Sequence, residues 1–157
     1  MPSPRSSRRI AAPPDEGAKL HLLAGESIDH FGDRWTQQVL STFFLGARRF
    51  DDIRIQCGVA TNILADRLKR LVEHGTLQRR ARAEDPRHHE YVLTPKGMDL
   101  YPIILTLMKW GDRWLAGRSG PPLILRCARC SHVLDAAVVC DQCGGRLDPH
   151  DVSFRRG

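Results

Sequence analysis

Four cysteines near the C-terminus are the residues whose types and spacing point most directly to chemistry. They form two Cys-x-x-Cys pairs, Cys127 with Cys130 and Cys140 with Cys143, with nine residues between the pairs. Four thiolates at this spacing match the ligand set of a tetrahedral structural zinc site. Four sulfur ligands also close the coordination sphere, which leaves no position for an activated water. We expect one structural zinc per chain and no zinc catalysis, with a reactive dithiol or disulfide pair as the alternative.

The composition is that of a folded protein with one ordinary domain and a small appendage. The chain has 157 residues, of which 41% are hydrophobic and 27% charged. No apolar run approaches the roughly 20 residues of a membrane span, and the N-terminus lacks the apolar core of a signal peptide. We therefore expect a cytoplasmic protein with reduced thiols and no membrane partner. The net charge of +6 favours a polyanionic partner, although solubility alone is an alternative explanation.

Changes in composition divide the chain into five predicted parts. Residues 1–18 are rich in Pro, Ser and Arg and predict a disordered basic tail. Residues 19–116 form the main domain, and "GRSGPP" at 117–122 reads as a linker. A zinc-ribbon-like module at 123–150 and a short tail at 151–157 follow. No internal repeat is evident in the sequence.

The first half of the main domain has the apolar period of helices. The segment 20–46 is helical, interrupted at Gly32, with Asp33 as the N-cap of its second part. A short helix at 53–57 ends at Gly58, and a longer one runs over 61–74. Two helices joined by a glycine-containing turn form a helix-turn-helix.

A change to the two-residue period of strands follows this motif. Alternating residues within 78–92 predict a β-hairpin, with "EDPR" at 84–87 as its tight turn, and this hairpin forms a wing. Thr94 and Pro95 then begin a long helix, which Pro102 should kink. The predicted fold class is mainly α with a small β-hairpin wing, a winged helix-turn-helix, plus a small four-cysteine zinc ribbon.

Several motifs carry a family resemblance that covers roughly residues 20–116. They are "GDRWT" at 32–36, "LGARRFDDI" at 45–53, "LADRLKRLVEHGTLQRR" at 64–80, "EDPRHHEYVLTPKG" at 84–97, Tyr101-Pro102 and Trp110-Gly111. In their order and spacing they resemble the HxlR-type winged helix-turn-helix transcriptional regulators. The resemblance implies a bacterial, homodimeric regulator that binds double-stranded DNA, with helix 61–74 in the major groove and wing 78–92 on flanking DNA. We expect it to act as a repressor.

The chain departs from the family pattern at two places. Where the family's recognition helix often begins with Ser-Pro, this chain has Ala60-Thr61, so we expect Thr61 to take the capping role. Family members that sense oxidants typically carry a cysteine before the first helix, at a register that falls near Leu22 here. The resemblance therefore does not extend to thiol sensing, and Cys57 is predicted to be a buried core thiol.

The predicted DNA contacts divide between base edges and phosphates. Candidates for base readout lie on the N-terminal half of helix 61–74, with one residue a turn further: Thr61, Asn62, Ala65, Asp66 and Lys69. Asn62 can pair with adenine and Asp66 can accept from cytosine, although Asp66 could instead pair with Arg70. Predicted phosphate or minor-groove contacts are Arg67, Arg70, Arg82, Arg87 and the wing residue His88.

The remaining apolar residues raise the question of a dimer interface. The resemblance places it on the first and last helices of the domain, at Ile28, Trp35, Ile104, Leu107, Trp110 and Trp114. Packing inside one chain is an equal alternative for the two last tryptophans. Trp35, Phe43, Trp110 and Trp114 could also enclose a small-molecule effector of unknown type, but we favour simple packing.

Two other function classes fit the sequence less well than a DNA-binding regulator. A zinc-containing protein-interaction module would use the winged helix as a docking element, but the arginine-rich wing favours DNA. An enzyme lacks support, since the sequence shows no nucleophile–base set, phosphate loop or open metal position.

Overall fold

The computed structural model describes residues 25–82, 85–148, 150 and 152. The chain divides into two compact units, one spanning Ala24–Met108 and the other including Lys109–Gly157. The predicted tails at 1–18 and 151–157 lie outside the described residues, apart from Val152. Residues 20–24 of the first predicted helix also lie outside them. Among the described residues, no helix combines the length and apolar character that a membrane span requires.

The first described helical segment is interrupted where the sequence predicted. Residues 25–31 are helical, and α2 (Arg34–Phe44) follows after a two-residue break. The Asp33 carboxylate accepts hydrogen bonds from the backbone N–H groups of Trp35 and Thr36, at 3.0 and 3.2 Å. Because these donors have no partner within the helix, this N-cap fixes the start of α2 and confirms its prediction.

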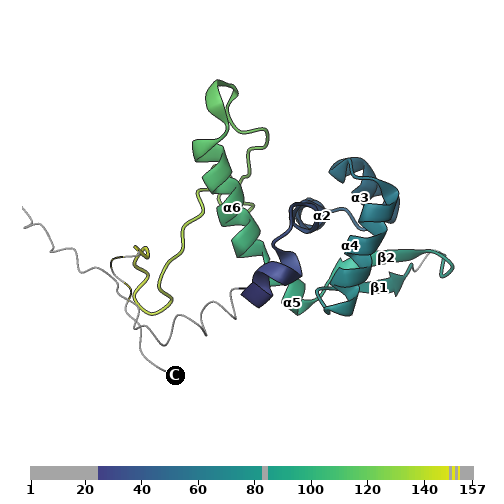
Figure 1. The fold of residues 1–157 in the computed structure, drawn as a ribbon. Coiled ribbons are helices and arrows are strands. Elements are labelled where there is room, and N and C mark those ends of the chain that lie inside the picture. The colour runs from purple at the N-terminus through teal and green to yellow at the C-terminus, as the bar shows by residue number, and fades with distance from the viewer. Residues whose placement is uncertain (1–24, 83–84, 149, 151, 153–157) are drawn as a thin grey trace, which may run out of the picture. The chain divides into compact units, whose positions relative to one another are not determined.

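The helix-turn-helix consists of α3 (Phe50–Cys57) and α4 (Thr61–Glu73), both of which lie beside α2 (Figure 1). Gly58 ends α3 with a left-handed φ of 64°, a conformation that glycine adopts without steric cost. The helix starts at Phe50, three residues before the predicted start. The prediction that Thr61 caps α4 is wrong, because Ala60 occupies the N-cap and Thr61 is the first helical residue.

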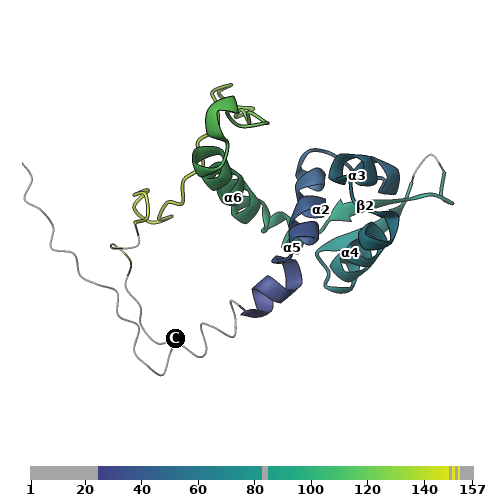
Figure 2. The same ribbon diagram turned by 45° about the horizontal axis from the view of Figure 1, so that its top comes forward.

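The predicted wing is present as an antiparallel hairpin. Its strands are β1 (Leu77–Ala81) and β2 (His89–Leu93), and Leu77 pairs with Leu93 at its base. The turn at its tip closes through a hydrogen bond from His88 N–H to the Asp85 carbonyl, one residue later than predicted, while Glu84 lies outside the described residues. Figures 1 and 2 both show the hairpin projecting beside α4.

Hydrogen bonds at the base of the hairpin fix its position against the helices. The backbone N–H of Tyr91 donates to the Arg48 carbonyl at 2.8 Å, which ties β2 to the loop between α2 and α3. The Thr94 hydroxyl donates to the Gly75 carbonyl at 2.6 Å, and Lys96 Nζ donates to the His74 carbonyl at 2.8 Å. The hairpin and the C-terminal end of α4 therefore form one rigid frame.

The long helix predicted after Thr94 is divided into two. Thr94 caps α5 (Pro95–Met98) by accepting from Gly97 N–H, as the Thr-Pro pair predicted. The chain then breaks and α6 (Tyr101–Trp114) begins, so Pro102 lies in the first turn of a new helix. Proline is tolerated there because the first-turn N–H groups have no helical acceptor. The expected kink is therefore a complete interruption.

The core of the first unit lies among α2, α3, α4 and β1. Its buried members are apolar residues at helical spacing: Val39, Leu40, Phe43, Ala47, Ile53, Cys57, Val59, Leu64, Leu68, Leu71 and Leu77. Burying each of the larger side chains contributes roughly 1.5–3 kcal/mol relative to exposure. The mainly helical class with a hairpin is thereby confirmed.

Candidate nucleic-acid interface and cysteine segment

Helix α4 buries one face and leaves the opposite face in solvent. Leu64, Leu68 and Leu71 are buried in the core. The exposed face carries the recognition row, which we define as Thr61, Asn62, Ala65, Asp66 and Lys69. Because residues three and four apart share a helix face, these side chains form one continuous surface. All five predicted base-readout residues are thus brought together on the solvent side of α4.

Arg67 lies behind this row and is held by two carboxylates. Its Nε lies 3.2 Å from Asp33 Oδ1, and its Nη1 lies 2.6 Å from Asp66 Oδ2. Only 20% of the Arg67 side chain is exposed. Its guanidinium therefore links α4 to the cap of α2, which favours a structural role over the predicted phosphate contact.

Asp66 belongs to the same network on its exposed side. Its Oδ2 also lies 3.1 Å from Arg70 Nε, the i,i+4 pairing that was the alternative to base readout. Both arginines contact Oδ2, so together they neutralise the carboxylate and fix its orientation on α4. Asp66 is thus engaged within the chain.

The network also changes the acidity of Asp33. Partial burial is the largest single effect and acts to raise the pKa of this carboxyl. Hydrogen bonds from Thr36, the charge of Arg67 and the Trp35 N–H together outweigh it and lower the pKa below its ordinary value of 3.8. Asp33 is therefore ionised at neutral pH, as a helix N-cap next to an arginine requires.

The strands of the wing place positive charge beside α4. Arg80 pairs across the hairpin with Glu90, at 3.0 Å from Nε and 2.6 Å from Nη2 to Oε1. Arg79 lies on the opposite face of β1, with its guanidinium 6.0 Å from the centre of the Tyr91 ring. Backbone hydrogen bonding continues past the strand, since Arg82 N–H donates to the His88 carbonyl.

A compact ion cluster forms the wing tip, residues 85–88. Arg87 Nε and its backbone N–H both donate to Asp85 Oδ1 at 3.1 Å, and His88 Nδ1 lies 3.0 Å from Asp85 Oδ2. These contacts, with the Arg87 side chain first, lower the pKa of Asp85 to about 2. The Arg87 side chain is itself 88% exposed. The wing tip therefore presents the Arg87 guanidinium to solvent, oriented by the Asp85 carboxylate.

A groove runs between the recognition row and the wing. It has a volume of about 440 Å³ and is lined by residues of α3, α4 and both strands: Phe50, Ala65, Leu68, Lys69, Val72, Glu73, Arg79 and Tyr91. Lys69 and Arg79 bring positive charge to it from two elements. Arg79 was not among the predicted site residues, although its position opposite Tyr91 in an alternating strand could have identified it.

The predicted dimer residues differ in exposure. Ile28, Leu107, Trp110 and Trp114 are exposed, the two tryptophans by 55% and 64%. Neither tryptophan is buried among the described residues, so packing inside one chain gains no support from them. Ile104 is only 3% exposed, so it is unsuited to the predicted contact with a partner. Trp35 is half-buried against the core.

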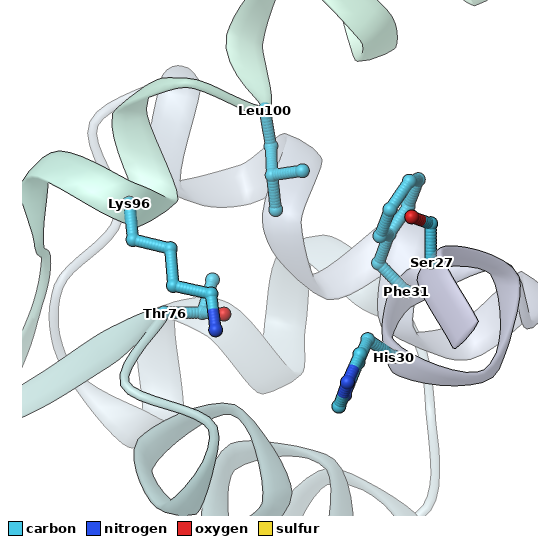
Figure 3. A pocket seen from close by; sticks show the side chains of 6 residues that line it. All are labelled: Ser27, His30, Phe31, Thr76, Lys96 and Leu100. Atoms are coloured by element: carbon cyan, nitrogen blue, oxygen red, sulfur yellow. The ribbon is translucent and has the colours of Figure 1, made fainter. Parts of the chain in front are cut away.

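A small cavity lies near the C-terminal end of α4 (Figure 3). Its volume is about 200 Å³, and it is lined by Ser27, His30, Phe31, Thr76, Lys96 and Leu100. His30 closes one side, with its Nδ1 2.9 Å from that of His74. This cavity lies elsewhere than the predicted aromatic one, which Phe43 cannot line because it is buried in the core.

The cysteines occupy two kinds of environment. Burial, opposed by a hydrogen bond with Thr42, raises the pKa of the Cys57 thiol, and this residue is a core thiol as predicted. Cys127 accepts hydrogen bonds from the N–H groups of Cys130 and Arg129, in that order of effect, and these lower its pKa. All five cysteines are free thiols, so the structure contains no disulfide between them.

The second pair repeats the environment of the first. The N–H groups of Cys143 and Gln142 donate to Cys140 and lower the pKa of that thiol. The thiols within each pair also contact each other. Across the described residues, no three potential metal ligands lie together, so the two pairs stand as separate two-thiol loops.

Comparison with known proteins agrees with this geometry. The family model described as HxlR-like helix-turn-helix matches residues 30–119. The uncharacterised HTH-type transcriptional regulator Rv3095 of Mycobacterium tuberculosis is 37% identical over 141 residues, covering 87% of this chain and 89% of its own. The similarity therefore extends beyond the helix-turn-helix domain. The HTH-type regulator YvaP of Bacillus subtilis is 31% identical, covering 57% of this chain and 84% of its own.

Solved structures give the same result. The crystal structure of the candidate transcription factor PA1607 has a TM-score of 0.74 and 30% identity, covering 83% of this chain and 91% of its own. The redox regulator HypR in its reduced form has a TM-score of 0.53 and 27% identity, covering 58% and 91%. These relatives are regulators and not enzymes, and they do not favour the alternative of a protein-docking module. The chain belongs to the HxlR-like helix-turn-helix family and is a DNA-binding transcriptional regulator.

Proposed function

We propose that the protein is a homodimeric repressor that inserts the N-terminal half of α4 into the major groove of its operator. The observation that carries this proposal is the recognition row, an exposed polar face on α4 beside an arginine-bearing hairpin. The major groove is about 12 Å wide and admits a helix, whereas the hairpin strands suit the flanking backbone. A repressor of this kind acts by occupying the operator.

Asn62 is the residue we assign to base readout. It is exposed in the first turn of α4. Its amide N–H can donate to adenine N7, and its amide oxygen can accept from the adenine N6 amino group, which makes a bidentate pair. Such a pair contributes about 1–3 kcal/mol of discrimination against the wrong base. Asp66 contributes less, because Arg67 and Arg70 already engage its carboxylate.

The wing supplies affinity without sequence preference. Arg87 at the tip and Arg79 with Lys69 in the groove lie where a phosphate backbone would pass beside α4. Each phosphate that a cation neutralises releases counterions and steepens the dependence of binding on salt by about 0.9 in the logarithmic slope. Lys and Arg at these positions therefore set affinity and register.

An apolar stripe on α6 supports dimerisation. Ile103, Leu107, Trp110 and Trp114 follow steps of four, three and four residues, and all are exposed. Exposing four large apolar side chains on one helix face to water is unfavourable, and contiguous apolar surface typically marks an interface. We assign it to the contact between two copies, which would present two α4 helices to a palindromic operator.

The DNA-binding proposal is tested with two substitutions and a matched control. Arg87→Gln should weaken binding to every sequence alike and flatten the salt slope by about one unit. Asn62→Ala should change base preference at one operator position by about 1–3 kcal/mol. Arg118→Gln removes the same charge from an exposed residue of η1 (Gly117–Ser119) and should leave both properties unchanged. If neither Arg87→Gln nor Asn62→Ala alters binding to the footprinted operator, the docking arrangement is wrong.

The dimer is tested separately. Trp110→Glu should shift the protein toward a monomer in sedimentation experiments, because it places a charge in the apolar stripe. The control is Ile55→Glu, which makes the same kind of change at an exposed apolar residue of α3. A wild-type protein that sediments as a monomer, or a Trp110→Glu protein that remains dimeric, would contradict the assignment of the stripe.

A further inference from the structure

The cysteine segment contains two copies of one loop, although the sequence shows no evident repeat. Within the first copy, Cys127 N–H donates to the His132 carbonyl at 2.9 Å, and Ser131 N–H donates to the Cys127 carbonyl at 2.7 Å. Thirteen residues later, Cys140 and Gly145 make the first of these bonds at 2.8 Å. Cys140 also accepts from Gly144 N–H at 2.8 Å, which reproduces the second.

The bases of the two loops are closed in the same way. An isolated antiparallel bridge joins Arg126 to Val133 in the first loop, and another joins Val139 to Arg146 in the second. The residues outside these bridges are also hydrogen bonded, Leu134 to Leu125 and Leu147 to Val138. Residues 125–134 and 138–147 are therefore two equivalent loops, which we call the first and second knuckle.

A left-handed residue occupies the same position in each knuckle. Gly144 has a φ of 69° and Ser131 has a φ of 61°. Ser131 is the one described non-glycine residue with a positive φ, a conformation that is uncommon outside glycine. Because a left-handed conformation is unfavourable for serine, the surrounding loop must impose this backbone conformation on Ser131. In both knuckles the backbone curls around the cysteine pair.

Each knuckle holds its two thiols as half of a ligand set. In the first, the backbone N–H groups of Arg129 and Cys130 point at the sulfur of Cys127, and in the second the equivalent groups point at Cys140. These backbone contacts fix the position of one sulfur relative to its loop in each knuckle. Two sulfurs per knuckle give four in total, the number a tetrahedral site requires.

The segment lacks the packing that would otherwise hold it together. Val133, Val138, Val139 and Leu147 are exposed by 44–58%. The described residues of 125–147 form isolated bridges but no strand or helix, and their cysteines form no disulfide. A segment this short needs a metal or a covalent link to gain a stable fold.

We propose that Cys127, Cys130, Cys140 and Cys143 bind one structural Zn²⁺, with each knuckle supplying two thiolates. The knuckles are separated only by residues 135–137, a connection short enough for both cysteine pairs to serve one ion. The proposal concerns residues outside the DNA-binding surface and does not depend on the proposed repressor function.

The experiment measures metal in the full-length protein purified under reducing conditions without chelator. Mass spectrometry of the elements should give about one zinc per chain. The double variants Cys127→Ser/Cys130→Ser and Cys140→Ser/Cys143→Ser should each lose it, whereas the control Cys57→Ala, which removes a core thiol, should retain it. Zinc that remains in either double variant, or no metal in the wild-type protein, would overturn the proposal.

Two further measurements identify the ligands. Replacing zinc with Co²⁺ should produce the visible absorption of a tetrahedral thiolate site, absent from both double variants. Cys143→His should retain more zinc than Cys143→Ser, because imidazole is itself a zinc ligand. One zinc per two chains would overturn the intrachain site, and iron bound one-to-one would support the site but overturn zinc as its metal. Retained DNA binding in the metal-free variants would separate this result from the proposed function.

Discussion

Replacing Asp33 tests whether Arg67 has a structural role in joining α4 to α2. Asp33→Ala removes the cap of α2 and the partner of Arg67 together. Loss of an N-cap typically costs about 1 kcal/mol. The ion pair adds up to about 1 kcal/mol, because the Asp33 side chain is 43% exposed and solvent screens it. We expect Asp33→Ala to lower the free energy of unfolding by about 2 kcal/mol.

Asp33→Asn separates the two contributions. Asparagine caps a helix about as well as aspartate but carries no charge, so this variant should lose only about 0.5–1 kcal/mol. Urea unfolding, followed by tryptophan fluorescence at one fixed protein concentration, measures both variants. With a slope of about 2 kcal/mol per molar urea, Asp33→Ala should unfold at roughly 1 M less urea than the wild-type protein. Equal losses in the two variants would refute the division into cap and charge.

The same residue predicts a dependence on pH. The pKa of Asp33 in the folded protein lies below its ordinary value of 3.8. Its carboxylate therefore contributes its full stabilisation at pH values above 3.8. This contribution is lost as the pH falls through 3.8 toward the lower folded value. The stability difference between the wild-type protein and Asp33→Asn should therefore shrink on acidification from pH 6 to pH 3. A difference that stays constant would show that the Thr36 hydrogen bonds and the Arg67 charge do not lower the pKa of Asp33.

Two further changes test the packing. Gly97→Ala would place a Cβ 2.3 Å from the Thr76 carbonyl oxygen, and we expect thermal or urea unfolding to show a loss of about 1–3 kcal/mol. The control Gly111→Ala meets nothing within 4 Å inside α6, so it should not destabilise the protein, and equal effects would contradict the packing argument. Cys57 should be the last of the five thiols alkylated by iodoacetamide in metal-free native protein, because burial raises its pKa and blocks access. Mass spectrometry that finds Cys57 modified as fast as Cys130 would contradict its place in the core.

Local chemistry explains why the sequence predicted most of the elements. Asp33, Gly58 and the Thr94-Pro95 pair mark helix ends through backbone hydrogen bonds and φ preferences that depend on a few neighbouring residues. The interruption before α6 escaped the prediction because Pro102 fits both a kinked helix and the first turn of a new one. The helix α5 also lies close to Thr76, a long-range contact that no local pattern reveals.

The roles of the charged residues were harder to predict for the same reason. Arg67 has the spacing of the buried leucines of α4, yet only the fold shows its partner, Asp33, which lies 34 positions earlier in the chain. The alternating pattern of β1 could identify the face that Arg79 occupies, but only the fold shows that this face lines the groove beside α4. Ile104 is apolar like the exposed residues of the stripe on α6, but it is buried within the chain. The periodicity of a sequence identifies the residues that share a helix face, whereas tertiary contacts decide which of their side chains remain exposed to a partner.

Ion pairs between arginines and carboxylates also make the net charge a poor measure of how many cations can bind DNA. Arg80 is paired with Glu90, Arg70 with Asp66 and Arg87 with Asp85, so a phosphate must compete with a carboxylate for each of these cations. Exposed ion pairs contribute at most about 1 kcal/mol, and a phosphate can displace such a carboxylate, whereas Arg67 is mostly covered and held by two acids. The salt dependence of binding should therefore reflect the exposed arginines of the wing and of α4 and exclude Arg67. A count of arginines near the helix-turn-helix consequently overestimates the number of phosphates that the protein contacts.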